Sequence, residues 1–282
     1  MKLLRYGPPG AERPGCLDAQ GRLRDLSGVV ADIAGAALAP EALERLRGLD
    51  PDSLPAVAGT PRLGPCVGGV GKLIGIGLNY SDHAAEAGLP VPPEPIVFMK
   101  ATSAICGPDD DVLIPEDASR TDWEVELAVV IGTRAQRVAQ DRALDHVAGY
   151  CICNDISERG WQIEHAGQWT KGKSHDTFAP LGPWLVTPDE VGDAGRLRMT
   201  LDVNGTPRQE GSTATMIFGV ARLVSYLSHF MTLHPGDVIT TGTPPGVGMG
   251  MKPPVFLKPG DVMRLMIERL GQQQQNVRRL RT

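Results

Sequence analysis

The stretch RTDWEVELAVVIG, residues 120–132, has the pattern of a buried β-strand, yet it contains two glutamates, Glu124 and Glu126. Strand side chains alternate between the two faces of a sheet, so residues two apart share a face. The two carboxylates should therefore stand side by side, which is unfavourable when buried because like charges repel and desolvation opposes both. We expect a positive group between them; the alternative is an edge strand whose polar face meets water.

Working outward from this stretch, strand-like runs dominate the chain and helices are few. Asn204-Gly205 is a strong signal for a tight hairpin, and Pro-Gly-Asp occurs directly before an apolar run at 235–237 and again at 259–261. The pattern predicts a mainly β domain with some α-helix, not an alternating doubly wound fold. The other predicted strands cover residues 96–101, 147–155, 181–187, 197–205, 237–242 and 262–268.

The clearest helical pattern lies at residues 214–231, where apolar residues recur at helical spacing and Ser212 or Thr213 is available as a cap. Short helices are expected after Asn79 and after Asp155. The polar tail GQQQQNVRRLRT, residues 271–282, is predicted to fray.

The first part of the chain has the pattern of a small α+β module. Residues 2–7 predict a strand, residues 15–28 a hairpin that turns near Gln20-Gly21, and residues 41–49 a short amphipathic helix. A segment rich in proline and glycine follows and is typical of a linker. We therefore predict a module and linker at 1–67 and a larger domain at 68–282.

Composition excludes several classes of protein. The chain has 41% hydrophobic and 22% charged residues and a formal net charge of -5, without a basic cluster interleaved with aromatics, so nucleic acid is not an expected partner. The polar start does not resemble a signal peptide and no apolar run approaches membrane-spanning length, which predicts a cytoplasmic protein. The five cysteines lack the spacing of a zinc site and are interpreted as structural thiols.

A third carboxylate, that of Asp155, suggests that the two glutamates belong to a metal site. Asp155 ends the apolar run GYCICND, and three oxygen ligands without converging Cys or His suit magnesium, manganese or calcium better than zinc. A partly hydrated ion at such a site leaves positions for water and for a chelating pair of substrate oxygens.

Three further stretches offer partners for chemistry at this ion. His83 and Glu86 are spaced i, i+3, so on a short helix the carboxylate can orient the imidazole, although a surface ion pair has the same spacing. Lys173, in a turn-rich segment, can stabilise a developing oxyanion or simply be solvated. The glycine-rich segment 240–250 offers hydroxyl and backbone donors to a carboxylate, but it lacks the lysine and the spacing of a nucleotide-binding loop.

The order of six motifs resembles the fumarylacetoacetate hydrolase (FAH) superfamily over roughly residues 70–270. These motifs are GIGLNYSDHAAE, PIVFMKATSAICGP, DWEVELAVVIG, GYCICNDISERGWQ, KGKSHDTFAPLGPW and GDVITTGTPPGVG. The resemblance implies a mixed β-sandwich roll, a bound Mg²⁺ or Mn²⁺ ion and a homodimer. It also implies that Glu124, Glu126 and Asp155 are the metal ligands.

The same resemblance implies roles for other positions of this sequence. His83 and Glu86 match the pair that activates water, and Lys173 matches the lysine that stabilises the enolate or oxyanion. The positions that match substrate or site-wall residues are Arg159, Gln162, Thr243 and Lys100. His175 departs from the family, where many relatives have an aromatic or apolar residue, so it either contacts the distal part of the substrate or fills space.

Members of the family cleave C–C bonds in diketo acids, and relatives decarboxylate oxaloacetate or isomerise unsaturated hydroxy acids. Residues 1–33 look like those of the bacterial subgroup that acts on 2,4-diketo-3-deoxy-L-rhamnonate or L-fuconate and releases pyruvate and a hydroxy acid such as L-lactate. The resemblance therefore implies a C–C hydrolase. Oxaloacetate decarboxylase, fumarylpyruvate or acylpyruvate hydrolase, ureidoglycolate lyase and a non-catalytic module that binds metal or sugar acid remain alternatives.

Overall fold

The computed structural model describes residues 1–280, and its sheets confirm the mainly β architecture. A 10-stranded sheet has the order β3-β2-β1-β12-β10-β9-β15-β4-β5, with β6 added beside β12, and a 5-stranded sheet has the order β14-β13-β16-β17-β7. The strands of the first sheet are β1 (Lys2–Tyr6), β2 (Arg13–Leu17), β3 (Leu23–Asp25), β4 (Leu73–Gly77), β5 (Ile96–Lys100), β6 (Ile105–Cys106), β9 (Val125–Ile131), β10 (Val147–Asn154), β12 (Ala179–Val186) and β15 (Val238–Thr240). Those of the second are β7 (Val112–Ile114), β13 (Arg198–Val203), β14 (Thr206–Ser212), β16 (Val262–Ile267) and β17 (Gly271–Arg279).

A short ribbon and several helices complete the fold. The ribbon pairs β8 (Thr121–Asp122) with β11 (Ser157–Glu158). The α-helices are α1 (Pro40–Arg47), α2 (Ser81–Glu86), α3 (Arg159–Ile163), α4 (Thr170–Lys173), α5 (Pro188–Val191) and α6 (Val220–Phe230). The 3-10 helices are η1 (Gly35–Leu38), η2 (Pro51–Ser53), η3 (Thr102–Ala104), η4 (Gln140–His146), η5 (Ala194–Arg196), η6 (Thr213–Thr215) and η7 (Gly248–Gly250).

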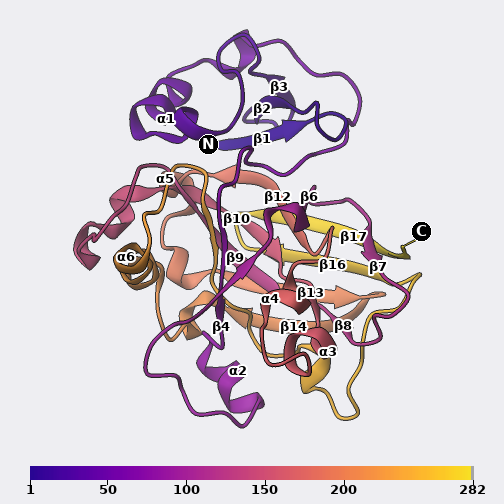
Figure 1. The fold of residues 1–282 in the computed structure, drawn as a ribbon. Coiled ribbons are helices and arrows are strands. Elements are labelled where there is room, and N and C mark those ends of the chain that lie inside the picture. Colours follow the sequence, from indigo (N-terminus) through magenta and orange to yellow (C-terminus); the bar gives the residue numbers. More distant parts are fainter. Residues whose placement is uncertain (281–282) are drawn as a thin grey trace.

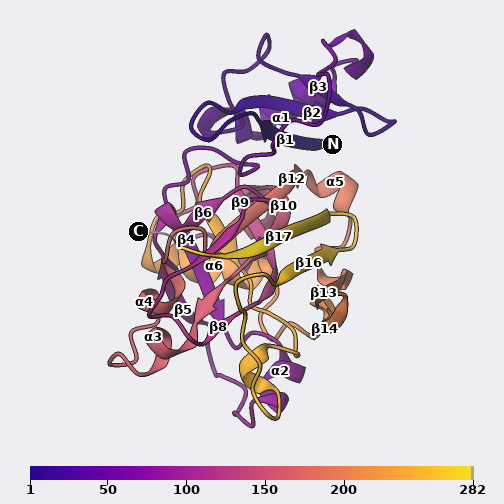
Figure 2. The same cartoon turned by 90° about the vertical axis from the view of Figure 1, so that its right-hand side faces the viewer.

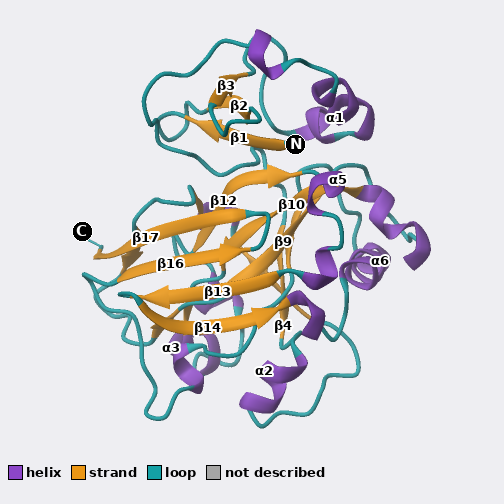
Figure 3. Ribbon diagram, turned by 180° about the vertical axis from the view of Figure 1, so that it is seen from behind, coloured by secondary structure: helices purple, strands orange, loops and turns teal. Residues whose placement is uncertain are grey.

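The two large sheets pack face to face, and β9 lies at the centre of this packing. All the residues of β9 are buried, and it pairs antiparallel with β10 on one side and β15 on the other. From the second sheet, β13 and β16 pack against β9, while β17 packs against β10 and β12 (Figure 3). The interpretation of residues 120–132 as an edge strand that faces water is therefore wrong.

The first module forms a lobe at the end of the molecule where β12 lies (Figures 1 and 2). Its strand β1 pairs antiparallel with β12, through Lys2 opposite Val186 and Leu3 opposite Leu185. The predicted strand, hairpin and helix are all present. The module extends the main sheet, so the two parts share backbone hydrogen bonds although the linker separates them in sequence.

The helix expected at residues 214–231 begins later than predicted. The helix α6 starts at Val220, because residues 213–215 form a 3-10 turn and Met216 makes an isolated bridge with Tyr80. Ser212 is a cap, but of this turn, where its Oγ accepts a hydrogen bond from the amide of Ala214. The short helices expected after Asn79 and Asp155 are present as α2 and α3.

The prediction that the polar tail frays is wrong for residues 271–279, which form β17 between β16 and β7; residues 281–282 lie outside the described residues. Alternate side chains of this strand are buried, among them Gln273 and Gln275, both 0% exposed. The Nε2 of Gln273 donates to the carbonyls of Ile152 (3.0 Å) and Gly182 (2.9 Å). The Nε2 of Gln275 donates to the carbonyl of Pro108 and to Oε1 of Gln273 (3.1 Å), so both glutamines can be buried because their amides have partners.

Replacing Gln273 by leucine should lower stability, because two buried carbonyls lose their donor. A buried polar group left without a partner costs about 1–3 kcal/mol, which corresponds to a decrease of roughly 2–10 °C in Tm for a domain of this size. Thermal melting measured by circular dichroism checks this. The control is Gln272→Leu at the preceding exposed position of β17, which should change Tm by less than about 2 °C. Equal losses in the two variants would contradict the role given to the buried amide.

All five cysteines are free and buried, in agreement with their interpretation as structural thiols. Among residues 1–280, no helix combines the length and the apolar character needed to cross a membrane.

Candidate metal centre and active-site cavity

The three predicted metal ligands lie in or directly beside two neighbouring strands of the main sheet. Glu126 belongs to β9, Glu124 directly precedes this strand, and Asp155 directly follows its antiparallel partner β10. Each side chain brings a carboxylate oxygen to within 4.8 Å of those of the other two. Their exposed fractions are 6% for Glu124, 1% for Glu126 and 0% for Asp155, so the cluster is buried.

The positive charge at this cluster is distributed unevenly. The Nζ of Lys173, at the end of α4, lies 2.7 Å from Oε2 of Glu124 and 2.8 Å from Oδ2 of Asp155. Lys100 of β5 contacts Asp155 from behind, with its Nζ 2.5 Å from Oδ1. Glu126 forms no ion pair with any residue that the structure describes, and its Oε2 accepts a hydrogen bond from the amide of Gly242 (2.8 Å).

The pKa values of the buried groups shift in accordance with this distribution of charge. Burial opposes ionisation of Glu124, but Lys173 and Arg159 outweigh burial and lower its pKa to about 2. Burial, with Asp155 and Glu124 close by, raises the pKa of Glu126 well above its usual value. Burial also opposes the charged form of Lys173, yet Asp155 and Glu124 raise the pKa of its ammonium group. The donor set consists of carboxylate oxygens alone and fits Mg²⁺ or Mn²⁺, and a divalent cation bound there would offset the negative charge of Glu126.

The backbone donor to Glu126 depends on a glycine. Gly242 has φ +90°, and a Cβ there would lie 2.9 Å from Cβ of Asn79 and 3.1 Å from the carbonyl oxygen of Ile76. Asn79 holds the same segment, because its Nδ2 donates to the carbonyls of Thr241 (2.8 Å) and Phe218 (3.1 Å). The segment 240–243 is therefore fixed close to the carboxylates, and its backbone donor at Gly242 is used by Glu126.

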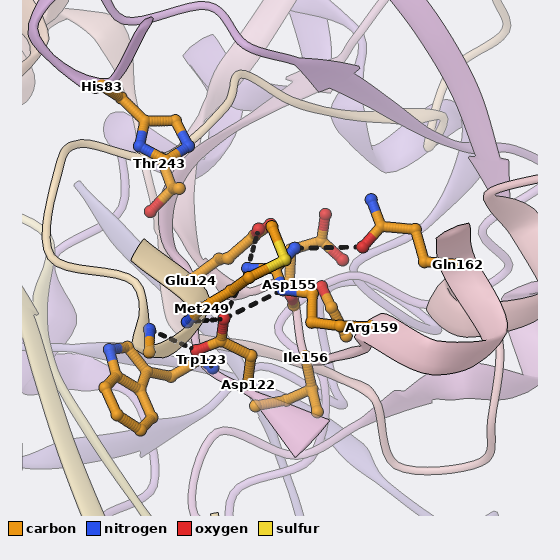
Figure 4. A network of polar contacts seen from close by, with 12 residues as sticks. His83, Asp122, Trp123, Glu124, Asp155, Ile156, Arg159, Gln162, Thr243 and Met249 are labelled. Carbon is orange, nitrogen blue, oxygen red and sulfur yellow. Dashed lines mark hydrogen bonds and ion pairs between the residues drawn. The ribbon is translucent and has the colours of Figure 1, made fainter. Parts of the chain in front are cut away.

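Arg159, the first residue of α3, connects the carboxylate cluster to neighbouring polar side chains (Figure 4). Its guanidinium contacts Glu124 (Nη2 to Oε1, 2.7 Å) and Asp122 (Nη2 to Oδ2, 2.8 Å), and its Nη1 donates to Oε1 of Gln162 (3.1 Å). The sequence analysis missed Asp122, whose carboxylate also accepts hydrogen bonds from the amides of Gly248 and Met249. Strand alternation could have found it, because it lies two residues before Glu124.

A cavity of about 630 Å³ opens above the carboxylates. Glu124, Glu126, Arg159 and Lys173 line its buried end. Its other walls are largely apolar and are formed by Ile76, Leu89, Ile96, Phe98, Ile163, Trp169, Val247 and Met249, among others. The cavity is large enough for a small organic acid, and it combines these apolar walls with charged groups.

His83 and Glu86 also line this cavity, from α2. The Nδ1 of His83 lies 3.0 Å from Oε2 of Glu86, so the predicted dyad forms. Glu86 also accepts a hydrogen bond from the amide of Gly246, at 3.0 Å to Oε1. This second contact fixes the carboxylate, which can then orient the imidazole toward the cavity.

The remaining predicted residues differ in their position. Gln162 and Thr243 line the cavity, but the hydroxyl of Thr243 is already engaged, since it donates to the carbonyl of Val125 (2.9 Å). Lys100 is 2% exposed and lies behind the cavity wall. The ring of His175 packs against Trp161 and Phe178 outside the cavity, with centroids 6.1 and 5.1 Å away, so the structure favours packing over substrate contact.

Comparison with known proteins agrees with this geometry. Residues 72–278 match the family model described as fumarylacetoacetate (FAA) hydrolase C-terminal. A protein of Burkholderia ambifaria, provisionally named a hydrolase, is 64% identical over 100% of both chains. The structure is similar to that of a fumarylacetoacetate hydrolase from Exiguobacterium antarcticum (TM-score 0.86, 37% identity, 99% of this chain and 100% of the other). It is also similar to that of a maleylpyruvate hydrolase from Sphingobium sp. SYK-6 in complex with manganese(II) and pyruvate (TM-score 0.83, 28% identity, 100% of both chains).

Proposed function

This chain belongs to the fumarylacetoacetate hydrolase superfamily, and we propose that it is a metal-dependent hydrolase that cleaves a C–C bond in a 2,4-diketo acid and releases pyruvate. The observation that carries the proposal is the buried cluster of Glu124, Glu126 and Asp155, in which Glu126 forms no ion pair with the described residues. This cluster adjoins a cavity that is also lined by the His83–Glu86 dyad. The carboxylate cluster is suited to hold a metal that polarises the α-keto acid, and the dyad is suited to activate water.

Glu124, Glu126 and Asp155 would hold Mg²⁺ or Mn²⁺. When bound, such an ion supplies Lewis-acid stabilisation of the negative charge that develops on the keto acid oxygens. The manganese(II) and pyruvate in the maleylpyruvate hydrolase structure support this choice of ion and of product.

The residues of this chain supply the other steps. His83, oriented by Glu86, removes a proton from water, and the resulting hydroxide adds to the distal carbonyl of the diketo acid. The C–C bond next to this carbonyl then breaks, its electron pair forms the enolate of pyruvate, and the distal fragment leaves as a carboxylic acid. Lys173, buried and positively charged, lies next to the carboxylates where it can stabilise the enolate oxygen. Protonation of the enolate carbon completes pyruvate.

Within this class, we propose 2,4-diketo-3-deoxy-L-rhamnonate or L-fuconate as the substrate, cleaved to pyruvate and L-lactate, on the basis of residues 1–33 and the family resemblance. Fumarylpyruvate, other acylpyruvates and the ureidoglycolate lyase reaction are the competing assignments, and oxaloacetate decarboxylation needs only the metal and the enolate stabilisation. The same resemblance supports a homodimer as the working form.

The test is pyruvate release from 2,4-diketo-3-deoxy-L-rhamnonate, acetylpyruvate and oxaloacetate, assayed in parallel. We expect release from at least one diketo acid, a loss of about 10²-fold or more after treatment with EDTA, and recovery when Mg²⁺ or Mn²⁺ is added. Release from oxaloacetate alone would support the decarboxylase assignment. Metal binding without turnover of any diketo acid would support the non-catalytic module.

A further inference from the structure

The strand structure is interrupted at Glu124, one of the three carboxylates of the metal centre. Strand β8 ends at Asp122 and β9 begins at Val125, so the amides of the two residues between them are not held by a continuous ladder of strand hydrogen bonds. Side chains hold them instead. The amide of Trp123 donates to Oδ1 of Asp122 (2.9 Å) and that of Glu124 to Oδ1 of Asn154 (3.2 Å).

The next amide, that of Val125, is held by a residue from the other sheet. It donates to Oε1 of Gln209 (2.9 Å), which belongs to β14 and is 1% exposed. Val125 is the residue between the two glutamates, so its peptide orientation determines how both carboxylates leave the backbone. Gln209 is therefore in contact with the backbone of the metal-binding segment, although 84 residues separate it from Val125 in sequence.

The amide nitrogen of Gln209 holds the segment 243–244, of which Thr243 lines the cavity. Its Nε2 donates to Oγ1 of Thr243 (2.7 Å) and to the carbonyl of Pro244 (2.8 Å), while the hydroxyl of Thr243 donates to the carbonyl of Val125. Gln209, Val125 and Thr243 thus form a closed ring of hydrogen bonds. Both polar groups of the Val125 backbone are fixed by this ring, and the amide of Gln209 has all its partners.

The surrounding backbone leaves Gln209 little freedom to move. A Cβ at Gly246 would lie 1.9 Å from the carbonyl oxygen of Arg208, and a Cβ at Gly211 would lie 2.4 Å from Cβ of Pro244. Strand β14 therefore lies directly against the segment 244–246, and a shift of one would displace the other. A side chain that lacks the amide could not be compensated by a small movement of the strand.

We infer that Gln209 is a positioning residue of the metal centre: it holds the backbone of Glu124 and Glu126 in register with the segment 242–244 and thereby sets the affinity for the divalent ion. Residues that orient metal ligands from behind typically contribute a factor of about 10–100 to metal affinity. The inference rests on the proposed function only in requiring that the three carboxylates bind a metal.

The experiment measures the Kd for Mn²⁺ by isothermal titration calorimetry and, in parallel, the Tm of the metal-free protein. Gln209→Met keeps the length of the side chain but removes its three hydrogen bonds, and we expect Kd to rise about 10–100-fold. In Gln209→Asn the side chain is too short to reach both Val125 and Pro244, so this variant should also raise the Kd for Mn²⁺. This milder variant provides the test if the Met variant does not fold.

Thr213→Val is the matched control. Thr213, in η6 just after β14, is 2% exposed, and its Oγ1 accepts a hydrogen bond from the amide of Leu197 (2.8 Å) without contacting the metal centre. It should lower Tm by about 2–6 °C and leave Kd within twofold of the parent. If the Gln209 variants lower Tm but bind Mn²⁺ as the parent does, the inference is overturned and Gln209 only joins the sheets. If the parent itself binds no Mn²⁺, it is the proposed function that fails.

Discussion

Replacing Glu126 by glutamine should lower Mn²⁺ affinity and pyruvate release by about 10³-fold or more, without destabilising the metal-free protein. The amide keeps the volume of the side chain and can still accept the hydrogen bond from Gly242. It removes the carboxylate that, among the described residues, has no cationic partner. Because burial and the nearby Asp155 and Glu124 raise the pKa of Glu126, the neutral amide resembles the form that the metal-free site favours.

The comparison of metal affinity with stability makes this prediction specific. We therefore expect the metal-free Gln variant to melt at the same temperature as the parent or above it, whereas only the parent is stabilised when Mn²⁺ is added. Calorimetric titration and thermal melting with and without Mn²⁺ check both parts.

Asp237→Asn is the control for Glu126→Gln. Asp237 is a carboxylate 1% exposed, and its Oδ2 lies 2.7 Å from Nζ of Lys72, outside the active-site cavity. Its replacement should lower Tm, because the partly buried ion pair with Lys72 loses its negative partner, and should leave Mn²⁺ affinity unchanged. Unchanged Mn²⁺ affinity in Glu126→Gln would show that the cluster is not the metal site and that its carboxylates have another role.

The features that could be predicted from the sequence are those that depend on local periodicity or on the family resemblance. The period of two placed Glu124 and Glu126 on one face, and the spacing of His83 and Glu86 placed them on one side of a short helix; the structure has both arrangements. The same period also places Asp122 on that face. The period does not show its partner, however, because the guanidinium that contacts Asp122 comes from Arg159, 37 residues further along the chain.

The features that could not be predicted arise from contacts between residues far apart in sequence. Gln273 and Gln275 have the pattern of a polar tail, since nothing within residues 271–282 shows that the amide of Gln273 meets carbonyls of the other sheet and that of Gln275 the carbonyl of Pro108. Gln209 likewise gives no local signal, because its partners come from β9 and from the segment 243–244. In each case a buried polar residue has the sequence pattern of an exposed one, and only its partners distinguish the two.

Replacing His83 by alanine should reduce hydrolysis of the diketo acid by about 10²–10⁴-fold and leave Mn²⁺ affinity within about twofold of the parent. The imidazole lines the cavity, contacts Glu86 and makes no ion pair with the metal cluster. Its loss therefore removes the base without changing the charge at the carboxylates. Steady-state kinetics of pyruvate release, together with calorimetric titration of Mn²⁺, measure the two quantities separately.

A matched control and a second substrate make the result for His83→Ala decisive. His229→Ala changes an exposed histidine at the end of α6, outside the cavity, and should leave both activities unchanged. Decarboxylation of oxaloacetate requires enolate stabilisation but no attacking water, so any such activity should persist in His83→Ala while hydrolysis is lost. Equal losses on both substrates would assign His83 to substrate binding, and full hydrolysis in the variant would show that water is activated elsewhere. The ratio of the two activities thus identifies the step that the dyad serves, because both substrates share the metal centre and Lys173 and differ in their need for a base.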